Sequence, residues 1–121
     1  MTITRLAALA AVAGSIPFAS MAQDAEVHFW LKGNPNNITG CIVGESQLTR
    51  EHTFILKGGQ ASITAPGGIN TKLALVRPNV YQETLSLGRL NLLVVADLAA
   101  TPKSLTVTDA NMGCGWSAVK E

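Results

Sequence analysis

Hydrophobic and polar residues alternate along most of the chain after residue 22, with the period of two that is typical of half-buried β-strands. The first clear run covers residues 27–32, where every second residue is large and apolar. Gly, Pro and Asn, which favour tight turns, separate the runs. Gly58 and Gly59 form the clearest turn, because glycine adopts the positive φ of a hairpin without steric cost. The pattern therefore predicts short strands joined by turns.

One segment leaves two alternatives open. Residues 90–98 are almost continuously apolar, so they form either a central strand covered on both faces or a short buried helix, and the adjacent Val94 and Val95 favour the strand. Residues 44–50 are more polar and are expected to form a loop. The other predicted strands are residues 27–32, 38–43, 51–57, 60–65, 69–77, 80–87, 104–108 and 114–119.

The number and spacing of these runs predict an all-β fold. We expect a small antiparallel β-sandwich, immunoglobulin-like, or a barrel of about seven or eight strands. Membership of the immunoglobulin family itself is not indicated, because no tryptophan lies between the two cysteines and Met112 stands two residues before Cys114, where that family has a tyrosine. The length suits one domain, which we expect at residues 23–121.

Residues 1–22 have the pattern of a cleaved secretory signal peptide. Arg5 supplies a positive charge, and the apolar stretch at 6–18 is shorter than the roughly 20 residues that span a bilayer. Ser20 and Ala22 are small residues at the −3 and −1 positions of a cleavage site before Gln23. We therefore expect a periplasmic or secreted protein with no integral membrane segment after cleavage.

The charge balance narrows the class of partner. Removal of Arg5 with the leader leaves eight basic and eight acidic residues. Such a chain lacks the basic excess that is typical of nucleic-acid binding or of a polybasic membrane anchor. We therefore expect no nucleic-acid partner.

Cys41 and Cys114 are the two cysteines of the chain, so they have one possible intramolecular pairing. Because an exported compartment is oxidising, the sequence predicts a structural disulfide between them. Structural metal sites use closely spaced cysteines and four ligands, whereas these two stand far apart. An intermolecular or redox role and a metal site are the alternatives.

Catalytic and metal-binding patterns are scarce. His28 and His52 lack the HxH, HxxxH and HExxH spacings, although neighbouring strands could bring them together with Glu26 or Glu51. No nucleophile elbow and no phosphate-binding glycine loop occurs in the sequence. We therefore predict no enzyme, no cofactor and no metal site, and a small metal-binding or hydrolytic enzyme is the least favoured alternative.

Trp30 is the best candidate for contact with a partner. Alternation along 27–32 places Trp30 with His28 and Lys32, on the face opposite the apolar residues of this run. An exposed aromatic side chain of this kind is typical of protein interfaces. The alternative is that this second face is also packed within the fold.

These inferences predict a small exported binding protein of the cell envelope. Its partner would be a protein or another envelope component, recognised through loops and an edge strand, as an inhibitor or a chaperone does. The alternative is a structural subunit of a surface fibre or matrix, in which copies of the chain self-associate by strand pairing.

Overall fold

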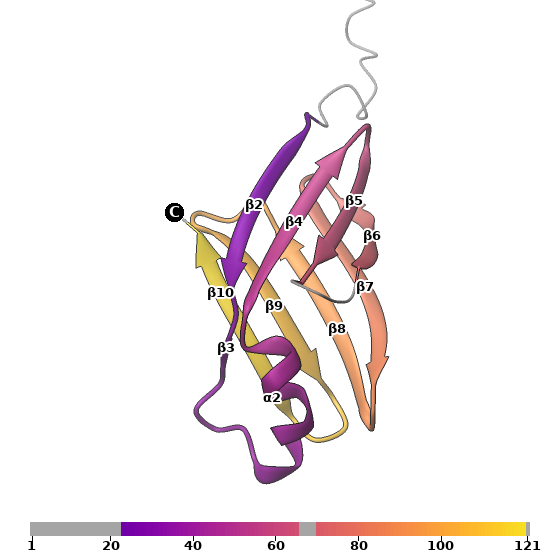
Figure 1. The fold of residues 1–121 in the computed structure, drawn as a ribbon. Coiled ribbons are helices and arrows are strands. Elements are labelled where there is room, and N and C mark those ends of the chain that lie inside the picture. Colours follow the sequence, from indigo (N-terminus) through magenta and orange to yellow (C-terminus); the bar gives the residue numbers. More distant parts are fainter. Residues whose placement is uncertain (1–22, 66–69, 121) are drawn as a thin grey trace, which may run out of the picture.

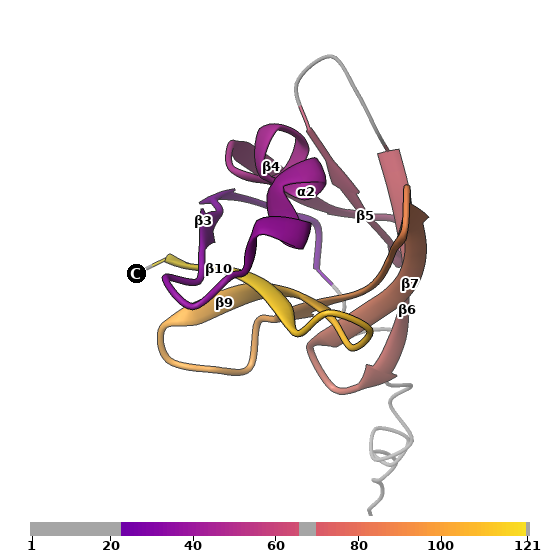
Figure 2. The ribbon, with the colours of Figure 1, turned by 90° about the horizontal axis from the view of Figure 1, so that it is seen from below.

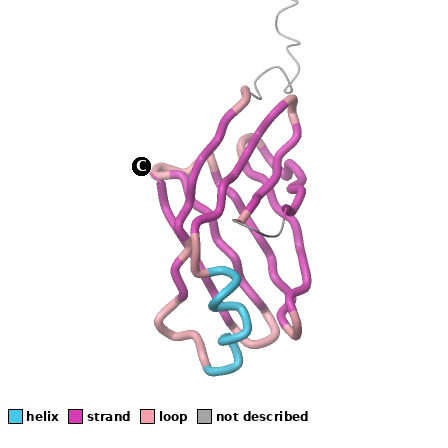
Figure 3. Tube along the Cα trace, viewed as in Figure 1, coloured by secondary structure: helices cyan, strands magenta, loops and turns pink. Residues whose placement is uncertain are grey.

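The computed structural model describes residues 23–65 and 70–120, so the predicted leader lies outside the described residues. Within these ranges nine strands form one antiparallel sheet in the order β2-β4-β5-β6-β7-β8-β9-β10-β3. The sheet curls into a nearly closed barrel, seen from the side in Figures 1 and 3 and from one end in Figure 2. The all-β prediction is therefore confirmed, and of its two alternatives the fold is the barrel. The strands are β2 (Ala25–Trp30), β3 (Lys32–Gly33), β4 (Glu51–Lys57), β5 (Gln60–Thr64), β6 (Asn70–Arg77), β7 (Val80–Leu87), β8 (Leu90–Asp97), β9 (Lys103–Asp109) and β10 (Cys114–Lys120).

Most strands follow the predicted alternation. Strands β4 and β7 have the predicted bounds, and Gly58 and Gly59 make the turn after β4 with positive φ angles of 59° and 80°. The ambiguous segment at 90–98 forms strand β8, in which Leu90, Leu92 and every second residue after them are buried. Its other face is half-buried or exposed, so β8 is an alternating strand and is not covered on both faces.

The predicted strand at 38–43 and the predicted loop at 44–50 are wrong, because this stretch is helical. A 3-10 helix, η2 (Thr39–Cys41), leads into α2 (Ile42–Leu48), which lies across one end of the barrel (Figure 2). The buried residues of the stretch are Cys41, Gly44 and Leu48, whose spacing of three and four is that of a helix. Ile42 and Val43, at the end of the predicted strand, are both exposed.

The predicted disulfide between Cys41 and Cys114 is present. It joins η2 to the first residue of β10, so Cys41 is held by a helix and not by the predicted second strand. Both cysteines are buried next to Trp116, which is itself only 2% exposed. The bridge therefore fastens the helical segment to the last strand of the barrel.

The first strand segment closes the barrel because it pairs at both ends of the sheet. β2 pairs with β4 over six residues, from Ala25↔Leu56 to Trp30↔Glu51. After Leu31, β3 pairs instead with β10, through Trp116↔Gly33 and Ser117↔Lys32. One continuous stretch of chain thus provides both outer strands of the order given above, and the sheet closes through it.

Strand β6 changes partner in a similar way. Its first half pairs with β5, from Thr64↔Asn70 to Ala61↔Leu73, and its second half pairs with the start of β7. An irregularity in the register between Leu75 and Arg77 accompanies this change. Strands that pass from one sheet layer to another at a bulge or bend are the usual corners of such folds. As a result the end of β7 pairs with β8 but not with β6.

Candidate functional site

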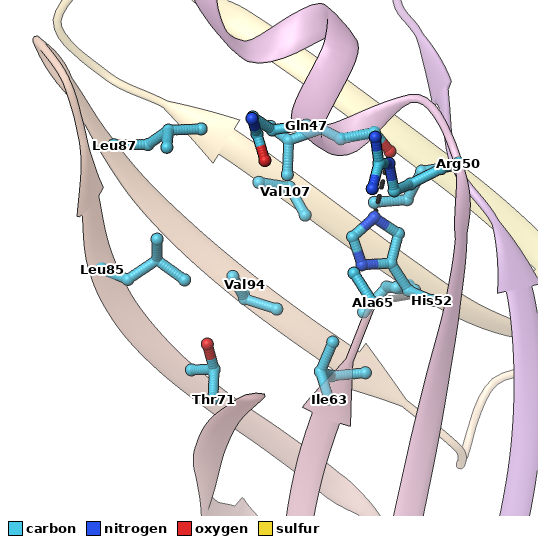
Figure 4. A pocket seen from close by; sticks show the side chains of 13 residues that line it. Gln47, Arg50, His52, Ile63, Ala65, Thr71, Leu85, Leu87, Val94 and Val107 are labelled. Atoms are coloured by element: carbon cyan, nitrogen blue, oxygen red, sulfur yellow. Dashed lines mark hydrogen bonds between the residues drawn. The ribbon is translucent and has the colours of Figure 1, made fainter. Parts of the chain in front are cut away.

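Two hollow regions of the described structure are candidates for a functional site. The first is a groove of about 540 Å³ on the outside of the barrel, between the first strand segment and β10. The second is a cavity of about 70 Å³ in the interior (Figure 4). The predicted contact residues Trp30 and Lys32 line the groove.

The groove exists because β10 and β2 diverge. Pairing between β10 and the first strand segment ends at Ser117↔Lys32, whereas β10 continues to pair with β9 as far as Lys120↔Lys103. Figure 1 shows the two strands separating beyond this point. The last three residues of β10 therefore have no register partner on the groove side within the described chain.

The backbone of Val119 faces this groove. Gly115 accepts a hydrogen bond from the Asn34 N–H at 2.8 Å, and its own N–H donates to the Asn37 Oδ1, so Gly115 is directed toward the first strand segment. Backbone groups of a strand alternate in direction, which places Ser117 and Val119 on the same side as Gly115. The N–H and C=O of Val119 thus point into the open part of the groove.

Apolar side chains border these backbone groups. Trp30 is 60% exposed and Val119 is 61% exposed, which are high values for large hydrophobic residues. Trp30 therefore lies on the surface, and its side chain is available for contact. The exposed Lys32 adds a positive charge to the same groove.

His28 lies on the same outer face but is engaged by its neighbours. Its Nε2 lies 2.9 Å from a Glu26 carboxylate oxygen, and its Nδ1 lies 3.3 Å from Glu51 and 3.2 Å from the Thr53 hydroxyl. These contacts link β2 to β4. The sequence prediction grouped His28 with Trp30 and Lys32, and the structure places it on that face but not among the residues that line the groove.

The two histidines do not come together. They belong to neighbouring strands, but Phe29 is the register partner of His52, and His28 is half-exposed while His52 is buried. Alternation therefore directs His28 outward and His52 into the barrel. Within residues 23–65 and 70–120, no group of three or more His, Cys, Asp or Glu side chains is arranged to hold a metal ion.

The interior cavity is lined mainly by aliphatic side chains. Figure 4 shows Ile63 and Ala65 on one side and Leu85, Leu87, Val94 and Val107 around the other. Polar atoms come from Gln47, Arg50, His52 and Thr71. The Arg50 guanidinium donates to the Ser46 carbonyl at 2.9 Å, so this side chain is held against the helix.

Two polar residues, His52 and Asp109, are buried in the described structure. They differ in how many of their polar atoms have a hydrogen-bond partner. The Asp109 carboxylate accepts the backbone N–H groups of Asn91 and Met112, each at 2.7 Å, and so has a structural role. His52 uses Nε2, which lies 3.1 Å from the Leu48 carbonyl. A carbonyl only accepts, so Nε2 carries the proton and Nδ1 is the acceptor nitrogen of the neutral ring.

Burial lowers the pKa of His52 below its ordinary value of 6.5, because the charged ring loses hydration inside the barrel. The hydrogen bond to Leu48 acts in the opposite direction, and the positive charge of Arg50 lowers the pKa further. His52 is therefore a neutral imidazole at pH 7.

This lowered pKa predicts a loss of stability in acid. The unfolded chain takes up a proton on His52 as the pH falls below 6.5, while the folded chain does not, so the free energy of unfolding decreases from pH 7.5 to pH 5. Urea unfolding followed by circular dichroism at both pH values measures this decrease. It should be smaller in His52→Gln, which lacks the buried imidazole. Equal decreases in the wild type and in His52→Gln would contradict the assignment.

Sequence reasoning identified the groove only in part. It selected Trp30 and Lys32 by alternation, but Val119 gave no signal, because its role depends on where the pairing with β10 ends. It considered His52 only as a weak catalytic or metal-binding candidate with His28, although alternation with the buried Phe54 and Leu56 would have directed it inward.

Comparison with known proteins gives no match, whether with protein-family models, curated proteins or solved structures. Among the described residues, no helix has both the length and the apolar character needed to cross a membrane.

Proposed function

We propose that the chain is a small exported binding protein of the cell envelope, without enzymatic activity, which recognises an extended segment of a partner protein. The segment would add to the free side of β10 as an extra strand. The observation that carries this proposal is that β10 has no strand partner beside the groove beyond Ser117. By strand alternation, this leaves the N–H and C=O of Val119 facing the groove.

The groove also supplies side-chain contacts of matching chemistry. An apolar side chain of the partner would lie between Trp30 and Val119, and tryptophan is among the residues that contribute most to protein interfaces. A carboxylate further along the partner segment would meet Lys32. The proposed partner segment is therefore extended, alternating in apolar residues, and acidic at one position.

The fibre-subunit alternative has less support. An N-terminal strand too long or too detached for its own sheet would favour a fibre subunit, whereas β2 is paired with β4 over its full length. Self-association would then have to use the same groove, with β10 of one copy pairing to β10 of another. Light scattering after size-exclusion chromatography distinguishes a monomeric binder from such a dimer or polymer.

Loss of the backbone donor at Val119 should weaken binding without unfolding the protein. The probe is a displayed library of linear twelve-residue peptides, from which the strongest binder is synthesised and titrated by calorimetry. Val119→Pro removes the N–H that faces the groove and should raise Kd roughly tenfold, because one partner carbonyl loses its hydrogen bond. Val119→Thr keeps the N–H and the branched shape, and should change Kd by less than about threefold.

Trp30→Ala tests the side-chain contact in the groove, as Val119→Pro tests the backbone contact. We expect it to raise Kd about tenfold and to leave Tm nearly unchanged. Leu75→Ala, at an exposed leucine of β6, is the control. Peptide binding that survives both Val119→Pro and Trp30→Ala would show that the groove is not the interface. A large fall in Tm in Trp30→Ala would instead show that this side chain stabilises the fold.

A further inference from the structure

The interior cavity has an opening in the wall of the barrel that is independent of the groove. Between β6 and β7 the pairing covers only the second half of β6 and the first residues of β7, so their other halves are not hydrogen-bonded to each other. The half-buried Thr71, Leu85 and Leu87 come from the halves of β6 and β7 that do not pair with each other, and they line the cavity. Because these three residues are half-buried, the lining of the cavity reaches solvent on this side of the barrel.

The ring of His52 leaves one polar atom unsatisfied in this apolar space. The residue is only 6% exposed, and its Nε2–H is used by the Leu48 carbonyl. Among the residues that the structure describes, none is hydrogen-bonded to Nδ1. A buried acceptor without a partner costs about 1–3 kcal/mol, so a hydrogen-bond donor that enters the cavity gains by meeting it.

The size and lining of the cavity favour an organic ligand over water alone. A volume of about 70 Å³ is several times the roughly 10–15 Å³ that one water needs. A buried water also needs two to four polar partners, which only the part of the cavity near Gln47, Arg50, His52 and Thr71 offers. The rest of the lining is mainly aliphatic and provides none. The volume is about half of the roughly 150 Å³ that holds a benzene ring in an apolar cavity, which favours a narrow chain over a ring.

We propose that this cavity binds a linear aliphatic alcohol, or the hydroxyl-bearing end of a longer alkyl chain, with the hydroxyl donating to Nδ1 of His52. The first carbons of the chain lie against the aliphatic lining, and the remainder leaves between Leu85 and Thr71 at the opening. The neutral state of His52 supports this arrangement, because the lone pair of Nδ1 stays available at pH 7. The site holds a small molecule and requires no part of the proposed peptide groove.

The test compares two probes that have the same number of heavy atoms. 1-Hexanol carries a hydroxyl donor, and 1-methoxypentane replaces it with an ether oxygen that only accepts. Both are titrated into the ¹³C,¹⁵N-labelled protein, and the methyl signals of Leu85, Leu87 and Val94 and the ring nitrogens of His52 are followed by NMR. We expect 1-hexanol to bind roughly fivefold or more tightly than the ether, and to shift the Nδ1 resonance.

Matched variants show which residue causes the difference in affinity between the two probes. His52→Phe should bind both probes alike, whereas His28→Phe, which changes the exposed histidine of the neighbouring strand, should keep the wild-type ratio. Because His52→Phe alters a buried position, Leu85→Trp provides a second variant that fills the opening and should abolish binding of both probes, with Leu75→Trp as its surface control. Equal affinity of the wild type for both probes, or methyl shifts away from the cavity, would overturn the proposal. So would a long-lived water at Nδ1 that 1-hexanol does not displace.

Discussion

Replacement of Trp116 by alanine should lower the free energy of unfolding by about 3–5 kcal/mol, the range found for large aromatic side chains removed from a core. Trp116 is 2% exposed, and its indole N–H donates to a Glu45 carboxylate oxygen at 3.0 Å. The ring also supports α2, since a Cβ added at Gly44 would lie 3.0 Å from it. Urea unfolding followed by circular dichroism measures the change, and Tm should fall by more than about 10 °C.

Two substitutions show whether this effect comes from packing. Trp116→Phe keeps most of the aromatic volume but removes the donor to Glu45, and should cost less than Trp116→Ala. Trp30→Ala removes the same side chain from the surface and should change stability by no more than about 0.5 kcal/mol. If Trp116→Ala and Trp30→Ala lowered the free energy of unfolding by the same small amount, the packing of α2 would not depend on Trp116.

Reduction of the disulfide should cost about 4 kcal/mol of stability. The bridge closes a loop between residues separated by 73 positions in the sequence, and opening such a loop restores chain entropy to the unfolded state. Urea unfolding with and without reductant measures the loss, and the double variant Cys41→Ala with Cys114→Ala should reproduce it. Two free thiols in the native protein would contradict the assignment, and intact mass, two hydrogens below the reduced value, is the supporting observation.

The effects of Trp116 and of the disulfide should not add. Both hold the helical segment against β10, Cys41 through the bridge and Gly44 through its contact with the indole ring. Substitutions that share partners are usually coupled by about 0.5–3 kcal/mol. Trp116→Ala should therefore cost less in the reduced protein than in the oxidised one.

The sequence predicted the structure best where that structure depends on residues that are close together along the chain. The pattern of strand and turn residues predicted β4 and β7 to the residue. β4 has one buried face and ends at Gly58-Gly59, and β7 lies between the turns at Pro78-Asn79 and Gly88. The pattern failed at α2, where Ile42 and Val43 resemble a strand but are exposed, and where the inward residues follow helical spacing. The helix depends on a distant partner, since Glu45 is anchored by Trp116.

In the candidate site, too, local features could be predicted from the sequence, whereas features that depend on distant segments could not. Alternation selected Trp30 as an outward residue, a property of one strand alone. The open side of β10 could not be predicted, because it depends on how far β3 and β10 stay in register. The acceptor role of His52 likewise depends on the position of the Leu48 carbonyl at the end of a helix that alternation did not predict.

The double pairing of the first strand segment has a consequence for the order in which contacts form during folding. Most of the sheet is a succession of hairpins, so most strand pairs join residues that are close in sequence and close only short loops. The pairing of β2 with β4 is also of modest range, whereas the pairing of Lys32 with Ser117 joins residues near opposite ends of the folded domain. The Cys41–Cys114 bond likewise joins distant segments. Because long loops cost the most entropy to close, we expect barrel closure and the disulfide to follow the formation of the hairpins.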